Sequence, residues 1–135
     1  MDVDTTDVRS AMNGSVLTVG PTHTLREASR AMASRKVGAA VVVDPDGEGA
    51  GIVTERDLLR ALADGDDPDV ETVGTHLTTE IVYASPSWTL EQAAEAMLRG
   101  GFRHLVVMDG GEVVGILSVR DIVRQWHEDR TASRS

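Results

Sequence analysis

The spacing of hydrophobic positions predicts a recurring order of short strands and helices. Residues 39–43 form an unbroken apolar run, which is typical of a strand covered on both faces. Between residues 24 and 36 the apolar positions instead recur every three or four residues, which predicts a helix with one buried face. Shorter apolar runs are predicted to form the other strands, at residues 16–19, 51–53, 81–83, 105–108 and 115–117.

Four places in the chain carry the sequence signature of a helix N-terminus, a threonine or serine cap followed three residues later by a polar or acidic residue. The pairs are Thr24 with Glu27, Thr54 with Asp57, Thr89 with Gln92 and Ser118 with Asp121. The first, second and fourth of the predicted helices end near Lys36 or Gly38, at about Ala63 and near His127. In the second of them, Leu58, Leu59 and Leu62 are expected to be buried. Asp7 is expected to cap a single helical turn.

The second half of the chain repeats the first. Residues 51–57 (GIVTERD) return as residues 115–121 (GILSVRD), an offset of 64. The preceding helix pattern returns at an offset of 65, with Leu25, Ala28, Ala31 and Met32 matched by Leu90, Ala93, Ala96 and Met97. A turn expected at residues 44–47 is one residue longer than its counterpart at residues 109–111, which accounts for the change. We therefore expect an α/β fold made of two strand-helix-strand-strand-helix motifs that pack with pseudo-twofold symmetry.

The boundaries of the two motifs follow from the repeat. The first is expected over residues 8–64 and the second over residues 75–128, with flexible termini at 1–7 and 129–135. Between the motifs lies an acidic connection with proline and glycine, which we interpret as a solvated linker.

Composition narrows the function. The net charge of −9 opposes binding to a nucleic-acid backbone, and four aromatic residues provide no series of stacking platforms for single strands. The absence of cysteine excludes disulfides and thiolate metal sites. The N-terminus lacks the features of a signal peptide, and no apolar run approaches the length of a membrane span, so a cytoplasmic location is expected.

The repeated stretch resembles the cystathionine-β-synthase (CBS) domain, and two copies in one chain resemble a CBS pair, or Bateman module. The resemblance rests on the sequences GIVTERD and GILSVRD, on the apolar strands that precede them, ending at Asp44 and Asp109, and on the order of elements. It covers about residues 8–128. Members of this family often bind adenosine compounds, and a free-standing pair would act as a regulatory, energy-sensing protein.

Two interpretations of the Thr/Ser-x-x-Asp stretch stay open on the residues alone. The hydroxyl and the carboxylate can simply cap the helix N-terminus. The same geometry also suits a nucleotide, because a helix N-terminus favours a phosphate and a carboxylate can accept hydrogen bonds from two ribose hydroxyls. The family resemblance favours the nucleotide, with AMP, ADP or ATP as the expected ligand and NAD(H) or S-adenosylmethionine as further candidates.

The resemblance also implies two clefts, each shared between the motifs. Site one combines Thr54, Arg56 and Asp57 with Tyr83, Phe102, Arg103 and His104. Site two combines Ser118, Arg120 and Asp121 with Val16, Thr18, Val37, Gly38 and Ala39. Because site one gathers more cationic side chains, we expect it to prefer phosphorylated ligands.

No catalytic or metal-binding residues are predicted. The four histidines show no paired spacing, and no nucleophile–base constellation or Walker-type loop is present, so we expect a non-enzyme without a prosthetic group. Its predicted partners are a small adenosine ligand, a second copy of the chain and a protein target in trans, but neither nucleic acid nor a membrane. Candidate dimer residues are Leu58, Leu62, Ile122 and Val123. The alternative is a structural or oligomerisation module that binds no small molecule.

Overall fold

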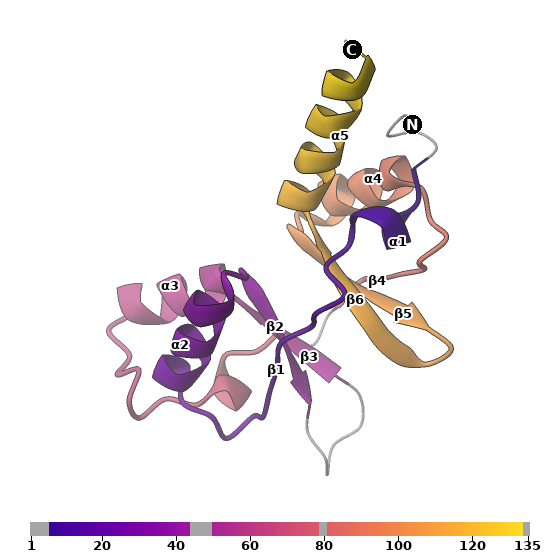
Figure 1. Cartoon of the computed structure of the whole chain (residues 1–135). Coiled ribbons are helices and arrows are strands. Elements are labelled where there is room, and N and C mark those ends of the chain that lie inside the picture. The colour runs from indigo at the N-terminus through magenta and orange to yellow at the C-terminus, as the bar shows by residue number, and fades with distance from the viewer. Residues whose placement is uncertain (1–5, 44–49, 79–80, 134–135) are drawn as a thin grey trace. The chain divides into compact units, whose positions relative to one another are not determined.

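The computed structural model describes residues 6–43, 50–78 and 81–133 (Figure 1). The chain folds as two units. The first unit is residues 17–81, and the second combines residues 82–135 with residues 1–16. Each contains a three-stranded sheet and two long helices, which confirms the predicted α/β fold of two strand-helix-strand-strand-helix motifs.

The first unit is built around the buried strand β2. Its elements are β1 (Thr18–Val19), α2 (Leu25–Arg35), β2 (Ala39–Val43), β3 (Ala50–Thr54), α3 (Glu55–Ala63) and the 3-10 turn η1 (Val73–Thr75). Strand β2 lies between β1, to which it is parallel, and β3, to which it is antiparallel. Leu25, Ala28 and Met32 of α2 reach the core at the spacing that the sequence predicts.

The second unit repeats this design with the helix α1 (Val8–Ala11) added. Its further elements are β4 (Tyr83–Ala84), α4 (Leu90–Gly100), β5 (His104–Asp109), β6 (Glu112–Ser118) and α5 (Val119–Ser133). Strand β5 pairs in parallel with β4 and antiparallel with β6. The β5–β6 turn uses Gly110 and Gly111, both at positive φ (61° and 85°), a conformation that side chains with a Cβ rarely adopt.

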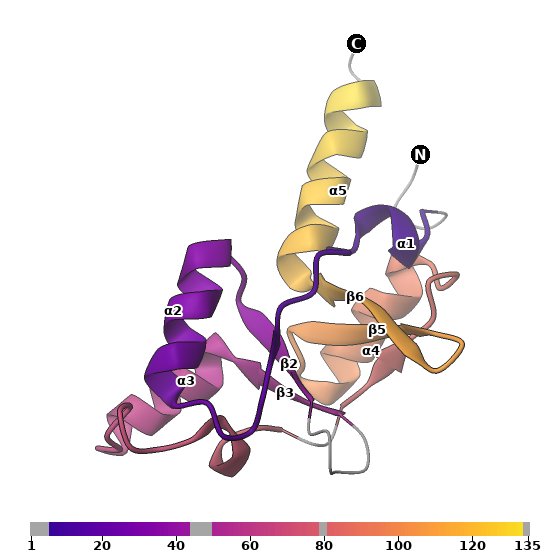
Figure 2. The same cartoon turned by 60° about the horizontal axis from the view of Figure 1, so that its bottom comes forward.

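The segment that precedes each motif in the sequence packs into the core of the other motif. Helix α1 lies beside α4 and β6 (Figures 1 and 2), and Val8 is fully buried with Leu90 and Leu105. The Val8 amide donates to the Trp88 carbonyl at 2.7 Å. In the first unit, Val73 of η1 plays the same part and is also fully buried. The residues that precede motif one therefore complete motif two, and those that precede motif two complete motif one.

This exchange explains the glycine that opens each repeated stretch. A Cβ on Gly51 would lie 2.6 Å from Leu77 Cδ1 and 3.2 Å from the carbonyl oxygen of Thr78. A Cβ on Gly115 would lie 2.5 Å from Met12 Sδ and 3.1 Å from the carbonyl oxygen of Asn13. Both glycines thus make room for the segment that pairs with the edge strand beside them, rather than for a turn.

Several predictions of element bounds need correction. Leu59 and Leu62 are 67% and 56% exposed, so their predicted burial is wrong. Ala61 is buried and Leu58 packs against the core, so the inward face of α3 contains these two residues. Helix α5 extends to Ser133, beyond the end predicted near His127.

The N-terminal boundary also differs from the prediction. Residues 1–7 are predicted to be flexible, yet the Thr6 side chain is fully buried and its carbonyl accepts from the Leu90 amide at 2.9 Å. Asp7 caps α1, as predicted, by accepting from the Ser10 amide. Residues 1–5 and the turn expected at residues 44–47 lie outside the described residues.

Three carboxylates make the stability of the chain sensitive to acid. Hydrogen bonds from Ser10 lower the pKa of Asp7, the bond from the Thr24 amide lowers the pKa of Glu27, and the bond from Arg26 lowers that of Asp69. The Arg26–Asp69 ion pair ties α2 to the connection after α3. Folding therefore favours the charged forms of all three groups.

At pH values above the ordinary pKa values of these groups, 3.8 and 4.5, we expect their ionisation to leave the melting temperature unchanged. The melting temperature should then fall as the pH drops through the lower pKa values that the groups have in the folded chain. The Asp69→Asn variant should lose less of its melting temperature between pH 5 and pH 3, as followed by circular dichroism, because the neutral amide cannot be protonated in that range. An equal loss in the variant and the unchanged chain would contradict this account.

Candidate functional site

The two repeated stretches fold into the same hydrogen-bonded box at the N-termini of α3 and α5. In the first unit, the Thr54 amide and hydroxyl donate to Asp57 Oδ2 at 2.8 and 3.0 Å, and the Asp57 amide donates to Thr54 Oγ1 at 3.3 Å. In the second unit, the corresponding Ser118–Asp121 distances are 2.8, 2.9 and 3.1 Å. The capping interpretation of Thr54 and Asp57 is therefore confirmed, and any ligand must bind a box that is already formed.

The box determines which atoms remain for a ligand. The single hydroxyl proton of Thr54 is directed at Asp57, so the hydroxyl cannot donate to a phosphate without breaking this bond. The first amide of α3, that of Glu55, donates to the Gly38 carbonyl at 3.0 Å, and the third, that of Asp57, to Thr54. The amide of Arg56 is the first-turn donor outside these bonds. Phosphate recognition would therefore depend more on arginine side chains than on helix amides.

The two aspartates differ in their second oxygen. Asp121 is 9% exposed, and its Oδ1 lies 3.3 Å from Arg124 Nη1. Asp57 is half-buried, and no donor among the described residues reaches its Oδ1. Asp57 can therefore accept from a ligand without giving up an ion pair, whereas Asp121 would have to share its carboxylate with Arg124.

The surroundings of the two boxes also differ. In the first unit Thr54 pairs with Ala39, and the Gly38 carbonyl accepts from the first helix amide. In the second unit Ser118 pairs with His104, and the Arg103 carbonyl accepts from the first amide of α5 at 3.0 Å. Within one unit, therefore, Gly38 and Ala39 adjoin the Thr54 end of the first box, whereas Arg103 and His104 adjoin the Ser118 end of the second.

The other predicted site residues lie on elements next to these boxes. Tyr83 is exposed on β4, and Phe102 closes α4 by donating its amide to the Met97 carbonyl. In the first unit, Val37 packs against the core, and Thr18 of β1 pairs with Val41 of β2. The remaining members, Arg56, Arg120 and Val16, comprise two exposed arginines and a half-buried valine. Both predicted sites draw residues from the two units, so their joining into clefts stays a prediction.

Sequence reasoning missed one group of ionisable side chains. Asp66, Glu71 and His76 converge in the connection after α3, with one possible ligand atom from each lying within 4.8 Å of the others. Their spacing of five residues matches neither helical nor strand periodicity, so no sequence pattern predicted that these side chains would meet. Within the described residues, no helix is long and apolar enough to cross a membrane.

The fold and the two boxes are those of a tandem CBS pair, and the comparison with protein families agrees. The CBS domain family matches residues 7–64 and again residues 70–128, so the chain belongs to that family. A relative in Bacillus subtilis, the CBS domain-containing protein YhcV, is 35% identical over 128 residues, which cover 93% of this chain and 90% of YhcV.

One similar protein of known structure was solved with a ligand. The chain is similar to a CBS domain protein from Pyrobaculum aerophilum complexed with AMP, with a TM-score of 0.77 and 29% identity over 90% of this chain and 98% of that one. Other relatives are longer. A protein of Methanocaldococcus jannaschii is 32% identical over 122 residues, and this chain spans only 43% of its length.

Proposed function

We propose that this CBS pair is a regulatory, non-catalytic module that binds adenosine-containing ligands of the AMP, ADP and ATP class. The observation that carries the proposal is the pair of matching Thr/Ser-Asp boxes, one of which keeps a carboxylate oxygen available on Asp57. A carboxylate in this position can accept from both hydroxyls of a ribose. The AMP complex of the Pyrobaculum aerophilum relative supports the same ligand class.

The proposed binding residues keep the two predicted groupings. Asp57, with Thr54 and Arg56, would hold the ribose and phosphate of a ligand completed by residues of the second motif. Ser118, Arg120 and Asp121 would do the same with residues of the first. The predicted preference of site one for phosphate depends on Arg103 and His104 joining Asp57. Arg103 and His104 lie beside Ser118, so they could instead contact a ligand bound at Asp121. Replacing Asp57 and Asp121 in turn distinguishes a phosphate site at Asp57 from one at Asp121.

A thermal-shift panel with AMP, ADP, ATP, NAD(H) and S-adenosylmethionine tests the proposal. A ligand present at 100 times its dissociation constant should stabilise the folded chain by about 2.7 kcal/mol. If none of these ligands shifts the melting temperature, the alternative of a structural or oligomerisation module without a small-molecule ligand is favoured.

A sensor of this kind acts through a protein partner. Ligand binding can shift the packing of the two motifs only if the ligand binds one arrangement more tightly than the other. The proposed target is a protein in trans, which would distinguish the ligand-bound from the ligand-free arrangement.

We further propose that the chain forms a homodimer through the exposed apolar residues of α3 and α5. Of the four predicted contact residues, Leu62 and Val123 are exposed, whereas Leu58 and Ile122 pack against the cores of their own units. The combined Leu62→Asp and Val123→Asp substitutions should yield a monomer in analytical ultracentrifugation, because they place unpaired charges in the interface. Leu98→Asp, at an exposed leucine of α4, is the control and should leave the dimer intact.

A further inference from the structure

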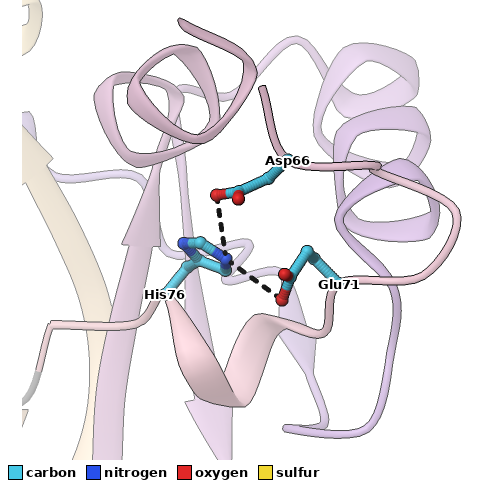
Figure 3. A group of neighbouring side chains, drawn as sticks. All are labelled: Asp66, Glu71 and His76. Atoms are coloured by element: carbon cyan, nitrogen blue, oxygen red, sulfur yellow. Dashed lines mark ion pairs between the residues drawn. The ribbon is translucent and has the colours of Figure 1, made fainter. Parts of the chain in front are cut away.

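Three side chains in the first unit face one small volume between α3 and η1 (Figure 3). His76 Nε2 lies 3.6 Å from Asp66 Oδ2 and 3.5 Å from Glu71 Oε2. The two carboxylates approach the same imidazole nitrogen from different parts of the connection, Asp66 from just after α3 and Glu71 from just before η1. The arrangement thus presents one nitrogen and two oxygens toward a common point.

Backbone hydrogen bonds hold all three residues in place. Each of their amides donates to a backbone carbonyl at 2.9 to 3.0 Å, the acceptors being Ala61, Asp67 and Val73. The Glu71 carbonyl in turn accepts from the Leu25 amide, which anchors the connection to α2. The convergence is therefore a property of the folded backbone and not of three long side chains meeting on a loose loop.

The distances from His76 to the two carboxylates fit ion pairs with a protonated imidazole and also fit a shared metal ion. An N–H···O hydrogen bond spans about 2.7–3.2 Å, so neither carboxylate forms a well-made bond to His76 Nε2. A tetrahedral zinc ion holds nitrogen and oxygen ligands at about 2.0–2.2 Å, which separates any two of them by about 3.3–3.6 Å. The two separations from His76 Nε2, 3.5 and 3.6 Å, match that edge, and the three candidate ligand atoms all lie within 4.8 Å of one another.

The chemistry of the three side chains narrows the choice of ion. Two carboxylates balance the charge of a divalent cation, and an imidazole nitrogen favours zinc and related transition metals over magnesium or calcium, which prefer oxygen ligands. The side chains of His76, Asp66 and Glu71 are 21%, 29% and 37% exposed, so an ion can reach the group from solvent and retain a water ligand. We propose that Asp66, Glu71 and His76 bind a divalent transition metal ion, with zinc as the best match.

The proposed metal site is independent of the proposed nucleotide site, because its ligands come from the connection after α3 and include neither Asp57 nor Asp121. A bound ion would link the end of α3 to η1, whose Val73 is buried in the core of the first unit. Metal binding should therefore stabilise the first unit whether or not a nucleotide is bound.

Calorimetric titration of the chelator-treated chain with Zn²⁺ tests this proposal. We expect one ion per chain, no competition from excess Mg²⁺, and an absorption spectrum of the Co²⁺-substituted chain that indicates tetrahedral coordination. His76→Ala should weaken zinc binding by at least about tenfold, since second-shell changes alone commonly cost that much. Asp64→Asn, which removes a nearby exposed acid outside the group, should leave the affinity unchanged.

Glu71→Gln provides a second test that preserves side-chain size, and it decides the matter if His76→Ala does not fold. It should weaken zinc binding as well. The proposal is overturned if the unchanged chain binds no zinc, or if the folded variants bind it as tightly as the unchanged chain, since the ion would then lie elsewhere.

Discussion

Val8→Asp is expected to unfold the second unit while leaving the first unit protected, although Val8 lies at the start of the chain. Val8 is fully buried against Leu90 and Leu105, so an aspartate there would bury a charge without a partner. An uncompensated buried charge costs about 3–5 kcal/mol, which is a large part of the stability of a small domain. Hydrogen exchange followed by mass spectrometry should show faster exchange in residues 82–128 than in residues 18–64.

Val73→Asp provides the mirror-image experiment. Val73 is fully buried in the core of the first unit, so its replacement should accelerate exchange in residues 18–64. Val70→Asp places the same charge at an exposed position of the same connection and should change little. Acceleration of residues 18–64 by Val8→Asp, with residues 82–128 unaffected, would contradict the exchange of segments between motifs.

Asp57→Ala is expected to weaken the binding of AMP by about 10- to 100-fold. A hydrogen bond to a charged group contributes about 1.5–3 kcal/mol, and the proposed ribose contact would be lost together with the carboxylate. The substitution also removes the carboxylate that closes the capping box of α3, which lowers stability without any ligand. The affinity must therefore be measured by calorimetry at a temperature where the variant is fully folded.

Glu27→Ala is the matched control for the loss of the cap. Glu27 closes the same kind of capping box at the start of α2, since its carboxylate accepts from the Thr24 amide at 3.0 Å. It belongs to neither proposed binding site, so its loss should lower stability without changing affinity for AMP. Equal losses of affinity in Glu27→Ala and Asp57→Ala would mean that the effect of Asp57 is structural.

Features that depend on nearby residues could be predicted from the sequence. The capping boxes at Thr24, Thr54 and Thr89 form as expected, because the hydroxyl and its partner are only three residues apart. The buried strands β2 and β5 also follow from their unbroken apolar runs. The repeat then gave the order of elements in both motifs, and the family resemblance assigned them to the CBS fold.

Features that depend on distant residues could not be predicted in the same way. Val8 and Val73 are isolated apolar residues in short turns, and nothing local indicates which core they enter. The exposure of Leu59 and Leu62 depends on how α3 is rotated about its axis. The apolar stripe of this helix is broader than its buried face, so the sequence pattern does not determine that rotation. The approach of Asp66 and Glu71 to His76 requires the folded connection, since their spacing carries no periodic signal.

Calorimetric titration of the unchanged chain with AMP, alongside Asp57→Ala and Asp121→Ala, tests the central claim most directly. We predict saturable binding by the unchanged chain and a loss of affinity when either aspartate that contacts the ligand is replaced. A greater loss with Asp57→Ala would support the predicted preference of site one, whereas a greater loss with Asp121→Ala would assign the phosphate to the box beside Arg103 and His104. The absence of saturable binding in the unchanged chain, or undiminished binding in both variants, would contradict the account.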